Sequence, residues 1–295
     1  MIDIQRLRVL QEVAVHGSFS KAATALLLTP SAVSQQIAAL ERSVGAPVVQ
    51  RSARGTSLTE PGRLLVESAD TIHAELAHVQ HEIGRLANGS QDTLTVATFT
   101  SGGQRLLPSA LTRLHTRHPN VLLTVIEGEV AESLARVKSG EADLALAYHF
   151  DGPPPVRDGD RNSLQWTPVM DDPMFIVLPA AHRLAGRSSI ALAELAQDRW
   201  VHGCIQIAQQ INTFAALAGF EPQVSCSTTD YVFAQSLVAA GVGVALIPQV
   251  ALAPGSGVAI AELQAPRPCR HIGIVVKRRR TRTIVNDLIA ELTTA

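Results

Sequence analysis

Residues 18–41 read SFSKAATALLLTPSAVSQQIAALE, and this stretch decides the fold at the start of the chain. Ser18 predicts the N-cap of a short helix with an apolar inner face. Thr29 followed by Pro30 marks the start of the next helix, because proline is tolerated at the first helical position. The spacing i, i+4, i+7 predicts one buried face on that helix, formed by Val33, Ile37 and Leu40.

An apolar helix closed by Gly17 precedes this pair, so the start of the chain predicts three helices. Two short helices joined by a brief turn, the second opening with small polar residues, form a helix-turn-helix. The DNA major groove admits one α-helix, and short side chains at its leading end let the backbone come close. On this interpretation Thr29 and Ser31 bind phosphate oxygens, while Ser34 and Gln35 reach base edges. The pattern also fits a small helical bundle whose Ser and Gln side chains are only solvated.

Arg51 and Arg54 lie beyond this helix and flank a predicted strand, which suits a wing that grips the DNA backbone. The motifs SFSKAA, LTPSAVS and, at residues 58–62, LTEPG occur in order within about sixty residues. Together they resemble the LysR-type transcriptional regulators. The resemblance implies a winged helix-turn-helix over residues 1–62 that binds double-stranded operator DNA.

The chain departs from the family pattern at several positions of the predicted recognition helix. Gln35 stands where arginine is common, and Ala38 and Ala39 stand where charges are common. Fewer cations imply fewer phosphate contacts, so we expect the DNA affinity to depend only weakly on salt.

Residues 63–90 predict one long helix that carries an apolar seam. The seam follows alternating spacings of four and three, at Leu65, Ala69, Ile72, Leu76, Val79, Ile83 and Leu86. Charged residues keep it narrow, which favours a dimerisation helix over a helix lying on its own core. We expect a homodimer through this helix and a homotetramer of such dimers, although the sequence leaves the dimer open as the final state. Three histidines on the helix are interpreted as solvated surface residues, and no metal site is expected.

From Thr93 onward the sequence alternates between strands and helices, which predicts a parallel sheet with helices on both faces. Expected strands cover 94–97, 121–126, 142–147, 174–178, 199–201, 223–227, 243–247 and 271–276. Expected helices cover 104–118, 131–139, 191–195, 206–218, 231–240 and 281–292. We assign residues 91–163 and 266–295 to a first lobe and residues 164–265 to a second. Two such lobes create a cleft.

Ligands of open α/β sheets bind beyond the carboxyl ends of strands, near helix N-termini. Thr100 and Ser101 in the loop 98–103 fit this position, since hydroxyls and approachable backbone N–H groups favour an anion. The loop from His202 to Cys204 and the residue Thr228 occupy similar places in the second lobe. Each also has a structural interpretation, as a helix cap or a turn residue.

Two phrases in this region, GEADLAL at 140–146 and GVGVALIP at 241–248, resemble the periplasmic-binding-protein-like effector domain of the same family. The resemblance implies effector contacts from the loop at Thr100 and Ser101, from the strand end near Glu129, and from the loop His202–Cys204. A carboxylate at Glu129 would repel an anion, so a cationic, zwitterionic or neutral effector is expected.

The amino-acid composition excludes several classes of protein. The chain of 295 residues is 46% hydrophobic and 17% charged, with a net charge of −1, so wholesale disorder is not expected. Because charged residues occur among the first twelve, we expect no signal peptide, and no apolar run is long enough to span a bilayer. We expect a cytoplasmic protein. Three cysteines without a Cys-x-x-Cys pair do not suit a disulfide scaffold or a four-cysteine zinc site.

The leading hypothesis is therefore a transcription factor controlled by a small-molecule effector between two lobes. An enzyme is the first rival, but no nucleophile elbow, metalloprotease motif or nucleotide-binding loop occurs, so no catalytic residue and no cofactor are expected. A solute-binding module that ignores DNA is the second rival. Oxidant sensing by Cys204 and Cys226 is a weaker hypothesis than two inert thiols. The basic run 277–282 is interpreted as a solvated turn.

Overall fold

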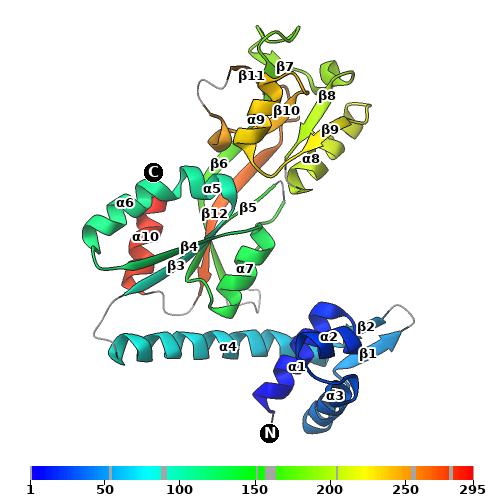
Figure 1. The fold of residues 1–295 in the computed structure, drawn as a ribbon, viewed down its shortest axis with the longest axis vertical. Coiled ribbons are helices and arrows are strands. Elements are labelled where there is room, and N and C mark those ends of the chain that lie inside the picture. The colour runs from blue at the N-terminus through cyan, green and yellow to red at the C-terminus, as the bar shows by residue number, and fades with distance from the viewer. Residues whose placement is uncertain are drawn as a thin grey trace. The chain divides into compact units, whose positions relative to one another are not determined.

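The computed structural model describes residues 2–52, 55–87, 92–150, 152–156, 164–203, 205–253, 257–278 and 282–294. The chain forms two compact units, an N-terminal one and a C-terminal one (Figure 1). Their elements confirm the expected fold class, a winged helix-turn-helix and a long helix followed by a two-lobed α/β domain.

Local sequence signals set the bounds of the N-terminal unit. It consists of α1 (Ile4–His16), α2 (Phe19–Ala25), α3 (Pro30–Val44), β1 (Val49–Ser52), β2 (Gly55–Leu58) and α4 (Glu60–Ala87). Asp3 caps α1 by accepting a backbone hydrogen bond at 2.8 Å, and Gly17 ends it in the left-handed conformation with φ of 60°. Ser18 occupies the N-cap position of α2, but its side chain makes no capping hydrogen bond with any described residue.

The core of this unit lies between α1 and α3. The buried side chains include those that the helical periodicity predicts, namely Leu7, Leu10, Val13, Val33, Ile37 and Leu40. The hairpin of β1 and β2 pairs Val49 with Leu58 in antiparallel register. Gly62 in the first turn of α4 packs directly against the chain that enters the hairpin. A Cβ atom at Gly62 would lie 2.0 Å from the carbonyl oxygen of Val48, so only glycine fits.

The C-terminal unit contains two lobes, each with its own apolar core. The first lobe holds β3 (Thr93–Thr98), α5 (Thr100–Arg105), α6 (Leu107–Arg117), β4 (Leu122–Glu127), α7 (Val130–Ser139), β5 (Leu144–His149) and α10 (Thr283–Thr293). The second holds β7 (Ser189–Ile190), β8 (Arg199–His202), α8 (Ile205–Leu217), β9 (Gln223–Ser227), α9 (Tyr231–Ala239), β10 (Ala245–Pro248), β11 (Val258–Leu263) and the 3₁₀ turns η1 (Leu192–Leu195) and η2 (Gln249–Ala251).

Two long strands, β6 (Leu164–Pro179) and β12 (Cys269–Lys277), lie where the lobes meet (Figure 1). The main sheet has the order β4-β3-β5-β12-β6-β11-β7, and β10 also pairs with β6. The first half of β6 pairs with β12, and its second half pairs with β10 and β11 of the second lobe. β12 follows the second lobe in the chain and pairs antiparallel with β5 of the first.

This topology corrects the expectation of a parallel sheet. β3 is parallel to β4 and β5, but β12 is antiparallel to β5 and to β6. The physical reason is that β6 and β12 run in opposite directions through the junction, one leaving the first lobe and one returning to it.

Two local predictions were also wrong, one strand was predicted too short, and one strand was missed. The stretch 98–103 is not a loop, because α5 begins at Thr100; Gly102 and Gly103 instead allow close packing on Phe99 and Thr98. The strand predicted at 174–178 is confirmed but too short, because it is the end of the sixteen-residue β6, whose half-exposed first part lacks a continuous apolar run. The helix predicted at 191–195 is the 3₁₀ turn η1, and β11 was not predicted.

Candidate functional site

The start of α3 presents small polar side chains to solvent. Thr29 caps the helix, because its Oγ1 accepts the backbone N–H of Ala32 at 3.2 Å, and it lies 3.0 Å from Oγ of Ser31. Ser31 and Gln35 are exposed, and Ser34 is half-buried. Unpaired N–H groups and the helix dipole make such a helix start attractive to an anion.

An open hollow of about 520 Å³ lies at this helix start. Its lining comes from the first turns of α2 and α3 and from the hairpin, and consists of Gly17, Ser18, Phe19, Ser20, Pro30, Ser31, Ser34, Gly55 and Thr56. The backbone N–H of Thr56 donates to the carbonyl of Gly17 at 2.9 Å, which holds the hairpin beside the helices. Gln35 is not among the described lining residues.

The two wing arginines are only partly described. The backbone of Arg51 lies in β1 opposite Thr56, but its side chain lies outside the described residues. Arg54 as a whole lies outside them.

The seam of α4 divides into a buried part and an exposed part. Leu65 and Ala69 are buried in the N-terminal core. Further along, four seam side chains are 37% to 59% exposed, namely Ile72, Leu76, Val79 and Ile83. The side chain of Leu86 lies outside the described residues. The seam therefore begins as core and continues as an apolar stripe in contact with solvent.

The C-terminal unit has a pocket of about 300 Å³. It is lined by Phe99, Thr100, Ser101, Glu127, Gly128, Glu129, Glu132, Tyr148, Thr229, Tyr231 and Arg270. The lining combines residues of the first lobe with two residues near the start of α9 and with one residue of β12. Among the sequence-predicted residues, the structure brings together Thr100, Ser101 and Glu129 here.

Arg270 is the central charged group of this pocket. Its side chain is only 1% exposed, and Asp172, fully buried on β6, accepts from its Nε at 2.9 Å and from its Nη2 at 2.5 Å. Nη2 also donates to Oγ of Ser101 at 3.1 Å. The guanidinium lies 4.7 Å from the ring centroid of Tyr148 and 6.0 Å from that of Tyr231.

Opposing influences act on the charge of this arginine. Burial alone would lower the pKa of Arg270, but the phenolic oxygen of Tyr231 and the carboxylate of Asp172 outweigh burial and raise that pKa above its ordinary value. The guanidinium is therefore charged at every physiological pH, and its charge is compensated within the protein.

Three carboxylates border the pocket on the side of the first lobe. Glu127 ends β4, and Glu129 and Glu132 follow it at the start of α7. All three are exposed, and Oε1 of Glu127 accepts from Oγ1 of Thr100 at 2.6 Å. Since Arg270 is paired with Asp172, the remaining charge that faces a ligand is negative.

Two other predicted effector residues, His202 and Thr228, do not line this pocket. His202 is buried at the end of β8, and burial lowers the pKa of its imidazole, which favours the neutral form. Its carbonyl accepts from the backbone N–H of Thr228 at 3.0 Å, so these two residues join neighbouring strand ends. Neither is among the described lining residues, whereas Thr229 is. Cys204 lies outside the described residues, so the pairing of Cys204 with Cys226 is not tested.

Sequence reasoning missed Arg270, Tyr148 and Tyr231. Arg270 carried a usable signal, because it is a charged residue shortly before the largely apolar stretch 272–276 of β12. Its partner Asp172 lies 98 residues away, so no local pattern links them.

A helix-turn-helix with a polar recognition surface, joined to a two-lobed domain with a ligand-sized pocket, defines the class of ligand-controlled DNA-binding regulators. The family model described as the lysR-family bacterial regulatory helix-turn-helix protein matches residues 4–63. The model of the LysR substrate binding domain matches residues 87–295. The chain belongs to the LysR family of transcriptional regulators, which combine DNA binding with an effector-binding domain.

Relatives match over nearly the whole chain. An uncharacterised HTH-type transcriptional regulator of Bacillus subtilis, YybE, is 25% identical over 92% of this chain and 91% of its own. The transcriptional dual regulator OxyR of Escherichia coli is 25% identical over 94% and 90%. The crystal structure of full-length CbnR complexed with target DNA has the same fold, with a TM-score of 0.56, 19% identity and 99% coverage of both chains. Among the described helices, none is long and apolar enough to cross a membrane.

Proposed function

We propose that this regulator contacts its operator through six residues: Thr29, Ser31, Ser34, Gln35, Arg51 and Arg54. Ser31, Ser34 and Gln35 stand at i, i+3 and i+4, so they share one helix face. Ser34 and Gln35 read base edges, Thr29 and Ser31 hold phosphates at the helix start, and the arginines hold the backbone from the hairpin. The observation that supports this most is the polar hollow at the start of α3, which Ser31 and Ser34 line.

The test compares two neighbouring glutamines on α3. Gln35→Ala removes a proposed base contact, whereas Gln36→Ala changes the neighbouring exposed side chain on another helix face. Binding sites are first selected from random duplexes with the wild-type protein. Gln35→Ala is expected to lose about 5-fold to 150-fold at one base-pair position, and Gln36→Ala is expected to keep the site preference. Identical preferences for wild type and Gln35→Ala would rule out the assignment.

We propose further that α4 joins two copies of the chain into a homodimer, and that such dimers pair into a homotetramer. The exposed stripe of Ile72, Leu76, Val79 and Ile83 supports the dimer, because apolar side chains at heptad spacing are stabilised by a second copy of the same helix. Two-fold symmetry then places two α3 helices on successive turns of DNA.

Sedimentation of the full chain tests the dimer. Leu76→Asp places a charge in the stripe and is expected to break the α4 contact, so that the assembly has a lower mass and binds DNA weakly. Glu75→Gln, at an exposed position outside the seam, is expected to leave the assembly intact. If the Leu76→Asp protein sediments as an assembly of the same mass as the wild type, α4 is not the dimer contact.

We propose that the effector is a small molecule with a positively charged group and an apolar body. Glu127, Glu129 and Glu132 supply the negative charge, and the rings of Phe99, Tyr148 and Tyr231 supply the apolar walls. Thr100 and Ser101 contribute hydroxyls. A carboxylate ligand finds its obvious partner, Arg270, already paired with Asp172. His202 and Thr228 receive no effector contact in this proposal, and Cys204 is left as a sequence expectation.

Calorimetric titration with a panel of small amines and matching carboxylates tests the effector class. Amines are expected to bind the wild type more tightly than their carboxylate counterparts. Glu129→Gln is expected to weaken amine binding, whereas Glu221→Gln, an exposed glutamate away from the pocket lining, leaves it unchanged. If carboxylates bind more tightly than amines, the proposal of a positively charged effector is wrong.

We propose that the chain acts in the cytoplasm, on DNA, and catalyses no reaction. The relatives are transcriptional regulators, which supports a regulator rather than the enzyme considered from the sequence. A gel shift with the DNA upstream of the protein's own gene separates a regulator from a solute-binding module, which would leave that DNA unshifted.

A further inference from the structure

The face of β6 and β12 that is turned away from Arg270 carries a second group of chemically active side chains. Arg270 and Asp172 are opposite each other in the register of the two strands, and so are His271 and Asp171. Because side chains alternate between the two faces of a sheet, His271 and Asp171 lie on the face opposite to the Arg270 pair. Cys269, two residues before His271, shares their face.

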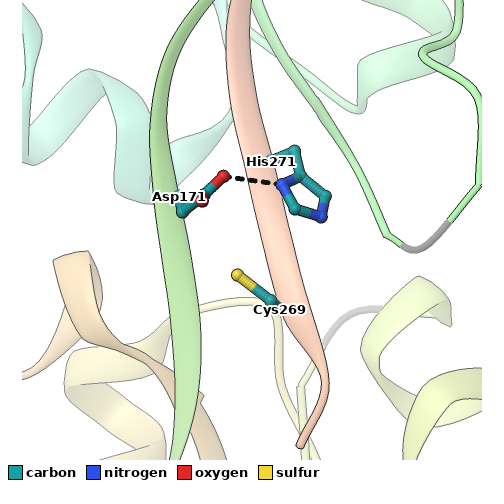
Figure 2. A group of neighbouring side chains, drawn as sticks. All are labelled: Asp171, Cys269 and His271. Atoms are coloured by element: carbon teal, nitrogen blue, oxygen red, sulfur yellow. Dashed lines mark hydrogen bonds and ion pairs between the residues drawn. The ribbon is translucent and has the colours of Figure 1, made fainter.

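Figure 2 shows Asp171 on β6 facing His271 and Cys269 on β12. Oδ1 of Asp171 lies 2.7 Å from Nδ1 of His271. The ligand atoms of the three residues all lie within 4.8 Å of one another. One thiol, one imidazole and one carboxylate therefore converge on one point, although the sequence separates Asp171 from the other two by about a hundred residues.

We propose that Asp171, Cys269 and His271 form a binding site for a divalent transition-metal ion of the zinc class. Thiolate sulfur, imidazole nitrogen and carboxylate oxygen are the three donor types that zinc accepts in proteins, and a water completes the tetrahedron. Hard ions such as Mg²⁺ and Ca²⁺ prefer oxygen donors and do not suit a cysteine.

The geometry needs only small side-chain adjustments. In a tetrahedral zinc site, neighbouring ligand atoms are roughly 3.4–3.6 Å apart, as follows from metal–ligand distances of about 2.0–2.3 Å. The Asp171–His271 distance of 2.7 Å must open slightly, and the widest separation, 4.8 Å or less, must close by roughly 1 Å. Asp171 is 76% exposed and His271 is 36% exposed, so both side chains have room to rotate and an ion can enter from solvent.

The proposed metal site lies on the two strands that run between the lobes. β6 and β12 lie where the lobes meet, and the cross-strand neighbour of His271 on its other side is His149 of β5. The ring centroid of His149 lies 5.1 Å from that of His271 and 5.5 Å from that of Trp166. An ion at this site is therefore near one of the two tryptophans of the chain, which provides an optical signal.

The experiment titrates the full-length chain, without a histidine tag and in reduced form, with Zn²⁺ alone and separately with Co²⁺. We expect saturable binding of about one ion at this site and a near-ultraviolet charge-transfer absorption from sulfur to cobalt. Co²⁺ should also quench Trp166. Cys269→Ser is expected to remove the absorption, and both Cys269→Ser and His271→Ala are expected to weaken Zn²⁺ binding by about tenfold or more.

The control is Cys226→Ser, which changes a cysteine of similar burial on β9 and should retain the absorption and the affinity. Circular dichroism and the urea midpoint of each metal-free variant establish that it is folded, and Asp171→Asn supplies a further variant at an exposed position. The proposal is overturned if wild type shows no saturable Zn²⁺ binding, or if Cys269→Ser and His271→Ala bind as wild type does.

Discussion

Removing the carboxylate of Asp172 tests the central electrostatic argument about the C-terminal unit. Asp172 accepts two hydrogen bonds from Arg270 and one from the backbone N–H of Val250, at 2.9 Å. Asp172→Ala removes the carboxylate from the buried guanidinium, which keeps its hydrogen bond to Oγ of Ser101. Breaking one side of a buried ion pair costs about 3–5 kcal/mol, which lies in the lower part of the roughly 3–9 kcal/mol for losing two or three hydrogen bonds to charged groups.

Urea unfolding followed by tryptophan fluorescence measures this loss. Both tryptophans, Trp166 and Trp200, lie in the C-terminal unit, so their fluorescence reports the unfolding of that unit. With a slope of about 2 kcal/mol per molar urea, a loss of about 4 kcal/mol lowers the midpoint by about 2 M. The matched control is Asp171→Ala, which removes the exposed neighbouring carboxylate in metal-free protein and is expected to change stability by less than about 0.5 kcal/mol.

A double-mutant cycle separates the pair from its surroundings. Arg270→Met alone leaves Asp172 buried without its cation and is expected to be destabilising as well. The double variant has no lone buried charge, so its loss should be smaller than the two single losses together by about 2 kcal/mol or more. The reasoning is refuted if Asp172→Ala costs less than about 1 kcal/mol, or if the two substitutions are additive.

Three further outcomes are expected. Gly62→Ala should lower the melting temperature of the N-terminal unit measured by calorimetry, because its Cβ would collide with the carbonyl oxygen of Val48; a neutral effect would mean that α4 shifts freely. Burial lowers the pKa of His202, so the unfolded chain binds a proton that the folded chain rejects; stability should fall as pH drops below about 6.5, and His202→Asn should flatten this part of the urea-midpoint profile. The slope of log affinity for operator DNA against log salt should be shallower than about −9, the value for ten phosphate contacts, and a steeper slope contradicts the small number of cations on α3.

The N-terminal unit could be predicted almost completely because its signals act over a few residues. Thr29 and Pro30 mark the start of α3, and Gly17 and Gly45 end α1 and α3 in the left-handed conformation that glycine adopts without strain. The seam of α4 was equally visible as a pattern. The pattern does not tell which of its side chains are buried in the same chain, and only the structure separates Leu65 from the exposed residues beyond it.

The C-terminal site was predicted in part. Thr100 and Ser101 were found because they follow a strand in an alternating pattern, and Glu129 because of the family resemblance. Arg270 was missed. The glycines at 102 and 103 were interpreted as loop residues, although they pack against side chains at the start of α5. His202 was placed at the site because a strand end looks the same in sequence whether its side chain faces a pocket or the core.

By itself the sequence determined the local elements, the recognition helix and the two-lobed alternation, because caps and periodicity depend on neighbours a few bonds away. Tertiary structure alone decided that β6 and β12 are antiparallel, that Arg270 finds Asp172 on one face, and that His271 and Cys269 find Asp171 on the other. The physical reason is the register between two strands about a hundred residues apart. A shift of one residue in that register would move the side chains of one strand to the opposite face, and the pairing partner of each strand is not part of its local sequence.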